Sequence, residues 1–167
     1  GFEISADNKN YRGNWTFTDG TTVSVAGDDN LSADDRLGSS GMVTLGNNAS
    51  LALSQVKDNI TIDNVFAGAG NLVVSGTNGQ TFEFSRKWSH AEASGFTGTL
   101  RLNGDIQMTV GGKGDSSGAN NAANLAYADF HLGADSKLIV EKQMSVVDTF
   151  DNLNVAQGST VEFKGQL

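Results

Sequence analysis

Apolar and polar residues alternate along almost the entire chain. Trp15 and Phe17 flank a threonine, and Val23 and Val25 flank a serine. Alternation over a few residues turns one side of an extended segment toward a core and the other toward water, so each such run predicts a half-buried β-strand. The same pattern recurs at Val43/Leu45, Leu51/Leu53, Ile60/Ile62, Leu72/Val74, Phe82/Phe84, Leu100/Leu102, Ile106/Met108/Val110, Phe130/Leu132, Leu138/Val140, Leu153/Val155 and Val161/Phe163.

Turn residues separate the predicted strands. Gly, Asn or Asp bounds each run, at intervals of about 8–12 residues, which is typical of a sandwich, a barrel or a solenoid. The chain has 21 Gly and no Pro, and its polar residues are mostly Asn, Asp, Ser and Thr. These residues favour turns and form poor helices. The sequence therefore predicts an all-β protein.

An internal repeat favours the solenoid among the three architectures. Segment 11–17 (YRGNWTF) aligns with segment 96–102 (FTGTLRL), and in the same register Val23 falls on Met108. The later strands follow in the same order. Repeats of this kind are the sequence mark of solenoids and arrays.

The repeat divides residues 1–167, taken as a single β-helix segment, into two units, about 1–79 and about 80–167. Within them, equivalent apolar pairs such as Leu51 and Leu72 lie roughly 20 residues apart. A rung of that length with two or three short strands predicts a parallel β-helix, in which strands one rung apart pair at about 4.8 Å. The lack of Pro fits, because Pro removes a ladder hydrogen bond. An array of two immunoglobulin-like modules is the structural alternative.

Four longer segments carry a further pattern. They read GAGNLVVSGTNGQTFEFS (68–85), GFTGTLRLNG (95–104), NNAANLAYADFHLGADSKLIVE (120–141) and DNLNVAQGSTVEFKG (151–165). In this order they resemble the passenger repeats of Gram-negative autotransporters of the pertactin-like and diffuse-adherence-adhesin type. The resemblance implies a right-handed parallel β-helix exported across the outer membrane by a C-terminal barrel that lies outside these residues. Segment 27–41 departs from the pattern.

The same resemblance implies a function at the bacterial cell surface or in the secreted fraction. The chain would be a passenger segment acting as an adhesin stalk or self-association surface in cell adhesion or aggregation. Its partners would be a host-cell or bacterial surface protein or glycan, or a second copy. A passenger-folding segment near the translocator and a polysaccharide-degrading β-helix enzyme are the alternatives.

The net charge and the lengths of the apolar stretches limit the classes of partner that the chain can bind. A net charge of −8 argues against nucleic acid, because binding to phosphates needs an excess of Lys and Arg. No stretch approaches the ~20 apolar residues that span a bilayer, so we expect no membrane insertion by this segment. The first residue is Gly rather than Met, which predicts a piece of a longer chain.

We predict no catalytic, cofactor or metal site. The chain has no Cys, which excludes disulfides, thiolate metal sites and a Cys nucleophile. Its two histidines, His90 and His131, lack a third group that would complete a nucleophile–base arrangement. His131 alternates with apolar neighbours and should point outward. The acidic segment 27–41 is either a Ca²⁺-binding loop or a solvated one.

The most distinctive segment is RKWSHAEASG (86–95). It gathers Arg86, Lys87, Trp88 and His90 in a chain otherwise acidic and poor in aromatic residues. Loops that leave a solenoid often carry binding functions, and an exposed Trp beside cations is typical of interaction hot spots. These four residues are therefore the predicted partner-binding loop. The alternative is that Trp88 folds back onto the flank of the solenoid.

Overall fold

The computed structural model describes residues 1–39, 41–56, 58–85, 88–110, 125–140 and 150–164. Nearly all of the ordered elements are strands, joined by two short helices. In chain order they are β1 (Phe2–Glu3), β2 (Trp15–Phe17), β3 (Thr22–Gly27), α1 (Ala33–Leu37), β4 (Met42–Leu45), β5 (Ser50–Gln55), β6 (Ile60–Ile62), β7 (Val65–Gly68), β8 (Asn71–Phe84), α2 (His90–Ala93), β9 (Thr99–Val110), β10 (Leu125–Leu132), β11 (Lys137–Val140), β12 (Phe150–Val155) and β13 (Thr160–Phe163).

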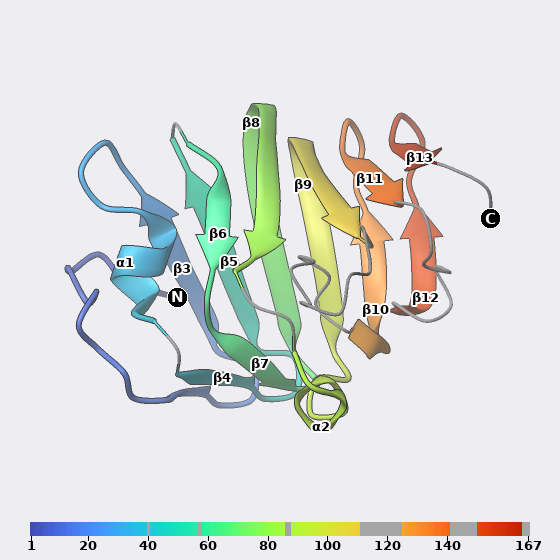
Figure 1. The fold of residues 1–167 in the computed structure, drawn as a ribbon. Coiled ribbons are helices and arrows are strands. Elements are labelled where there is room, and N and C mark those ends of the chain that lie inside the picture. Colours follow the sequence, from blue (N-terminus) through green and yellow to red (C-terminus); the bar gives the residue numbers. More distant parts are fainter. Residues whose placement is uncertain (40, 57, 86–87, 111–124, 141–149, 165–167) are drawn as a thin grey trace.

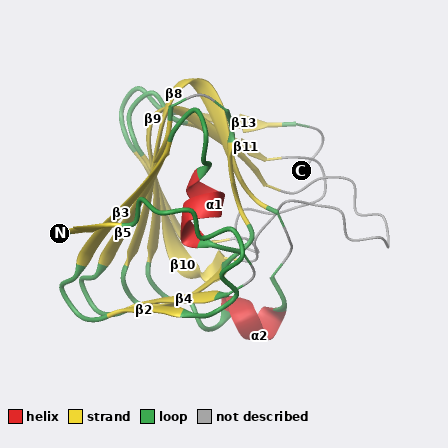
Figure 2. Ribbon diagram, turned by 90° about the vertical axis from the view of Figure 1, so that its left-hand side faces the viewer, coloured by secondary structure: helices red, strands yellow, loops and turns green. Residues whose placement is uncertain are grey.

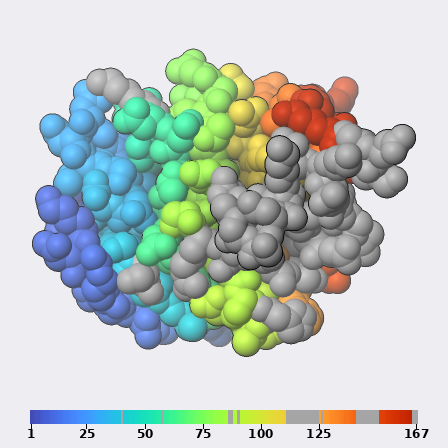
Figure 3. Space-filling view, viewed as in Figure 1, coloured from blue at the N-terminus to red at the C-terminus, as the bar shows by residue number. Residues whose placement is uncertain are grey.

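The strands stack into a parallel β-solenoid of about five turns (Figure 1). In the space-filling view, successive parts of the sequence form successive bands across the molecule (Figure 3). Leu51 pairs with Leu72, and Leu138 with Val161, as the spacing of apolar pairs predicted. The parallel β-helix is thus confirmed. Every strand pair in the described part of the chain is parallel, unlike the antiparallel sheets of an immunoglobulin-like module.

One large sheet bends at a corner, and a small sheet completes the rungs. The long path of the large sheet runs β1-β3-β5-β8-β9-β10-β12, and β6, β11 and β13 extend it beyond the corner. Strands β8 and β9 cross that corner where Gly76 pairs with Gly104. Gly104 has φ of +77°, and a Cβ on it would lie 2.5 Å from the carbonyl oxygen of Gly76, so the corner requires glycine. Strands β2, β4 and β7 form the small sheet.

The same turn precedes four of the strands. Gly20, Asn48, Asp135 and Gly158 each lie two residues before a strand begins, and their φ values are 72°, 57°, 65° and 87°. Gly, Asn and Asp are the residue types that adopt this left-handed conformation most readily. The Gly/Asn/Asp punctuation of the sequence therefore marks where each rung turns.

The side chains between the sheets form a continuous apolar core. One column consists of Leu51, Leu72, Leu100 and Phe130, which occupy neighbouring rungs in register and are fully buried. Every alternating segment of the sequence is part of a strand. Each inward residue packs on its counterparts one rung above and below. The core therefore requires an apolar residue at every second position, which produces the alternation in the sequence.

The two ends of the described solenoid differ. Helix α1 lies within the outline of the rungs when the molecule is viewed from its N-terminal side (Figure 2), and Ala33 and Leu37 are fully buried there. At the opposite end, Val155 on β12 and Phe163 on β13 are 52% and 48% exposed. A helix therefore covers part of the N-terminal end of the apolar core, although Phe2 on β1 is 71% exposed there, and the C-terminal end also leaves apolar side chains at the surface.

Candidate functional site

The structure places part of the predicted partner-binding loop. Arg86 and Lys87 lie outside the described residues, and His90 is the first residue of α2. Trp88 is only 1% exposed. It is therefore a core residue, not an exposed contact, and the expectation of an exposed Trp is corrected in favour of the folded-back alternative. Partner binding by this segment stays a prediction.

An aromatic cluster explains why Trp88 turns inward. Its ring centroid lies 4.9 Å from that of Phe84, 6.1 Å from that of Phe66 and 6.3 Å from that of Phe96. Aromatic pairs at such separations stabilise a core beyond the area they bury. The indole nitrogen of Trp88 has no hydrogen-bond partner within the described structure, so burial of the ring, not a polar contact, determines its position.

Segment 86–95 also contains a helix that composition did not predict. The backbone N–H of Ser89 donates to the Glu92 side chain at 2.7 Å, and the Glu92 N–H donates to the Ser89 hydroxyl at 3.2 Å. This reciprocal pair is a capping box, which satisfies two backbone donors at the start of α2. In the sequence, the Ser-x-x-Glu spacing of Ser89 and Glu92 was the signal that could have predicted this helix start.

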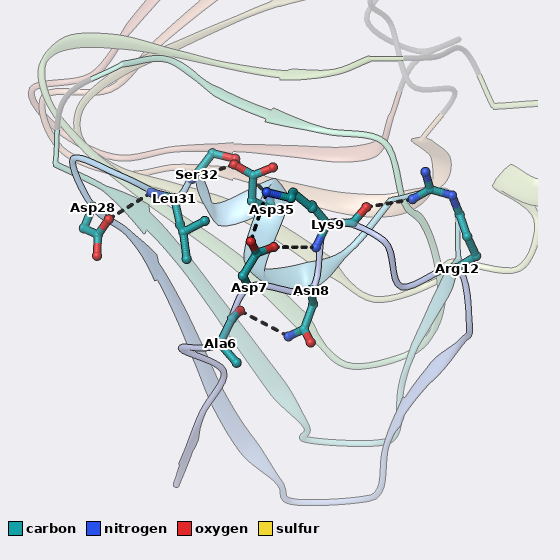
Figure 4. Close-up of polar contacts among 9 residues, drawn as sticks. All are labelled: Ala6, Asp7, Asn8, Lys9, Arg12, Asp28, Leu31, Ser32 and Asp35. Atoms are coloured by element: carbon teal, nitrogen blue, oxygen red, sulfur yellow. Dashed lines mark hydrogen bonds and ion pairs between the residues drawn. The ribbon is translucent and has the colours of Figure 1, made fainter.

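The acidic segment 27–41 is organised in the same way around α1. Ser32 accepts from the backbone N–H of Asp35 at 2.9 Å, and Asp35 accepts from that of Ser32 at 3.1 Å, closing a second capping box. The aspartate carboxylate of Asp28 accepts from the N–H groups of Asn30 and Leu31; Figure 4 shows Asp28, Ser32 and Asp35 with their neighbours. These hydrogen bonds use carboxylates to hold the backbone.

Two carboxylates of this segment are electrostatically unlike each other. Hydrogen bonds from the backbone of Asn30 and Leu31, with help from Arg36, hold the pKa of Asp28 below its usual value. Burial raises the pKa of Asp34, and the nearby Asp63 and Asp35 charges add to this. Within the residues that the structure describes, no three His, Asp or Glu side chains converge in a way that could hold a metal ion.

A polar row on the outer surface is the strongest candidate for a binding site. Arg101 on β9, His131 on β10 and Asn154 on β12 are in register on three neighbouring strands. Arg101 Nη2 lies 3.2 Å from His131 Nδ1, and Asn154 Nδ2 lies 3.3 Å from His131 Nε2. We call these three residues the outer ladder. The predicted outward direction of His131 is confirmed.

A second polar pair lies beside the outer ladder. Asn152 Nδ2 donates to Asp129 at 2.7 Å and to Asp151 at 3.3 Å. Asp129 is two residues before His131, and Asn152 two before Asn154, so both point to the same outer side of the sheet. Five polar side chains from three strands thus lie on the same outer face of the sheet.

The outer ladder borders a groove of about 430 Å³. Arg101, His131 and Asn154 line it together with Leu132, Leu153, Val155 and Ala156. The side chains of the outer ladder point outward, whereas Leu153 and Val155 are in register with the buried Phe130 and Leu132 and point to the core side. The groove therefore offers hydrogen-bonding groups to a ligand on the outer face of the sheet.

Comparisons with known proteins add no family to these observations. No protein-family model, curated protein or solved structure matches the chain.

None of the helices in the described residues has the length and hydropathy needed to cross a membrane.

Proposed function

We propose that the chain is a segment of a Gram-negative autotransporter passenger and acts as an adhesive shaft at the bacterial cell surface. The observation that carries the proposal is a parallel solenoid whose outer surface bears an in-register row of polar side chains beside a groove. A solenoid buries its core between rungs, so its sides stay free for lateral contacts along its whole length.

The autotransporter resemblance supports this proposal at particular positions. Segment 95–104 (GFTGTLRLNG) supplies the first half of β9 and the corner at Gly104. Segment 151–165 (DNLNVAQGSTVEFKG) contributes to β12, the turn at Gly158 and β13. The phrases of the resemblance thus coincide with strands and turns of single rungs, as expected of passenger repeats.

Adhesion would depend on the regular spacing of the rungs. Outward side chains in register on neighbouring strands repeat at about 4.8 Å, so a partner that presents hydrogen-bonding groups at similar intervals can contact several rungs at once. The proposed partners are a host-cell or bacterial surface protein or glycan, or the side of a second copy. Many weak contacts then add to a strong attachment.

Beads coated with the chain test the proposed function. Coated beads should attach to host cells or cluster with one another. Beads coated with a Leu100→Asp variant, which places a charge in the core, should do neither, because this variant cannot keep the solenoid. If folded and unfolded coatings give the same attachment and the same clustering, an adhesive role is contradicted.

A further inference from the structure

The outer surface of β10 carries three kinds of side chain that suit a sugar. Tyr127, Asp129 and His131 alternate with the buried Ala128 and Phe130, so they share one side of the strand. Tyr127 is 40% exposed. An aromatic ring, a carboxylate and an imidazole in one row offer an apolar platform together with hydrogen-bonding groups.

The outer ladder has a defined hydrogen-bond direction. Arg101 can only donate, so His131 Nδ1 must accept, and the neutral ring then carries its hydrogen on Nε2. The Asn154 atom nearest to Nε2 is Nδ2, which cannot accept that hydrogen. Because the oxygen and nitrogen of an amide are interchangeable in shape, we assign the Asn154 oxygen to this position as the acceptor. The Asn154 NH₂ group and the remaining guanidinium N–H groups are left as donors beside the groove.

The charge of Arg101 makes the outer ladder selective for an anion. No ion pair of Arg101 with a carboxylate occurs in the described part of the chain, where its side-chain contact is the ring of His131. That contact orients the guanidinium, and no carboxylate among the described residues forms an ion pair with it. A guanidinium fork matches a carboxylate with two parallel hydrogen bonds.

A simple anion would suit Arg101 but not the other polar side chains of this surface. The chain has a net charge of −8, and Asp129 lies beside the outer ladder, so a ligand with negative charge alone would be repelled. A ligand with hydroxyl groups can donate to Asp129 while its carboxylate accepts from Arg101.

We propose that this groove binds a polysaccharide that contains uronic acid. The sugar carboxylate pairs with Arg101, and hydroxyl groups contact Asn154 and Asp129. The inference rests on the proposed adhesive function, because it names the ligand class of the same surface.

Calorimetric titration with polygalacturonate tests the binding site. Arg101→Gln should weaken binding about tenfold or more, because it removes a charge-assisted bidentate pair. Asn154→Asp should weaken it as well, by placing a carboxylate where a donor is needed. The matched control is Arg12→Gln, which removes an exposed arginine near the N-terminal end and should leave binding unchanged. All four proteins should show the same circular dichroism spectrum, because the substituted residues are at the surface.

Three results would overturn the inference. They are no binding of polygalacturonate by the unsubstituted chain, equal loss in Arg101→Gln and Arg12→Gln, and equal affinity for neutral dextran or sulfated dextran. The bead assay separates this inference from the proposed function. If Arg101→Gln abolishes polygalacturonate binding in the titration but coated beads still attach equally well, the adhesive shaft stands and its attachment does not use the uronic-acid site. If the unsubstituted chain binds no polygalacturonate while its coated beads attach, the uronic-acid site is refuted and the adhesive shaft stands. If the chain binds polygalacturonate in the titration but coated beads attach to nothing, the uronic-acid site stands and the adhesive function is refuted.

Discussion

Trp88 provides the sharpest quantitative prediction, because its ring is buried against three identified aromatic side chains. The ring is 1% exposed and contacts Phe66, Phe84 and Phe96. Truncation of a buried Trp to Ala costs about 3–5 kcal/mol of unfolding free energy. Domains of ordinary stability have about 5–15 kcal/mol in total. We therefore expect Trp88→Ala to remove a large part of the stability of the protein.

Trp88→Phe separates packing from polarity. Phe keeps an aromatic ring for the cluster and removes an indole N–H that has no partner in the described structure. A buried donor without a partner costs roughly 1–3 kcal/mol, so its removal should offset much of the lost volume. We expect Trp88→Phe to change the unfolding free energy by no more than about 1 kcal/mol. Trp15 is the matched contrast, because its indole donates to the Leu37 carbonyl at 2.8 Å.

Urea unfolding at 25 °C, followed by far-ultraviolet circular dichroism, measures these changes. The Trp15→Phe protein retains Trp88 as its only Trp, and its fluorescence should be blue-shifted and resistant to aqueous quenchers. The reasoning is refuted if Trp88→Ala lowers the unfolding free energy by less than about 1 kcal/mol, since a surface residue behaves in that way.

Three further substitutions test the turns and helix starts. Gly98→Ala should destabilise the fold by about 1–3 kcal/mol, because the added methyl would overlap the Gly70 carbonyl. Gly79→Asn is the control in the same unfolding assay. It should be tolerated, because Gly79 has a left-handed backbone that Asn can adopt and has open space around its Cβ position. Ser32→Ala should cost about 1 kcal/mol through loss of the α1 cap, and an unchanged unfolding midpoint would argue against that cap. Asp34 has a raised pKa in the folded protein, so the folded state binds more protons there and stability falls as pH rises from about 3.9 through that raised pKa. Asp34→Asn should therefore gain stability relative to the unsubstituted chain between pH 3 and pH 7, measured as unfolding free energy across that range; a constant difference would contradict the assignment.

The sequence predicted the strands because every rung imposes the same requirement on its inward positions. The spacing of about 20 residues also predicted stacked pairs, Leu51 with Leu72 and Leu138 with Val161. The repeat made Val23 and Met108 equivalent positions of two units but did not give their strand partners, which are Leu51 for Val23 and Phe82 and Leu138 for Met108. Apolar alternation looks alike on every side of a rung, so it identifies inward residues without assigning them to a side.

Irregular segments escaped prediction for local reasons. In β7, Val65 and Phe66 are both buried, so this strand has no alternation to detect. The two helices are only 5 and 4 residues long, too short for a periodic apolar pattern to reveal, and the Asn/Asp/Ser/Thr/Gly-rich composition of the whole chain argued against helices. Their Ser-x-x-Asp and Ser-x-x-Glu capping boxes were the local signal that outweighed composition.

The candidate site lay beyond sequence reasoning for a different reason. Alternation alone fixed the outward direction of His131. Its neighbours Arg101 and Asn154 are 30 and 23 residues away along the chain, and only the register of β9, β10 and β12 brings them together. Trp88 shows the converse, because its polar neighbours in the sequence suggested exposure while Phe66, Phe84 and Phe96 bury it.

Cysteine cross-linking tests the parallel, in-register stacking most directly, since the chain contains no other Cys. Ala52 and Val73 are register partners on neighbouring rungs, and Arg101 is the next partner of Val73. Adjacent strands lie about 4.8 Å apart, within the reach of a disulfide, whereas two rungs span roughly 9.6 Å and exceed it. The account predicts that Ala52→Cys with Val73→Cys forms an intramolecular disulfide on mild oxidation, and that Ala52→Cys with Arg101→Cys does not. Efficient cross-linking of the second pair, with none of the first, would contradict the stacked solenoid.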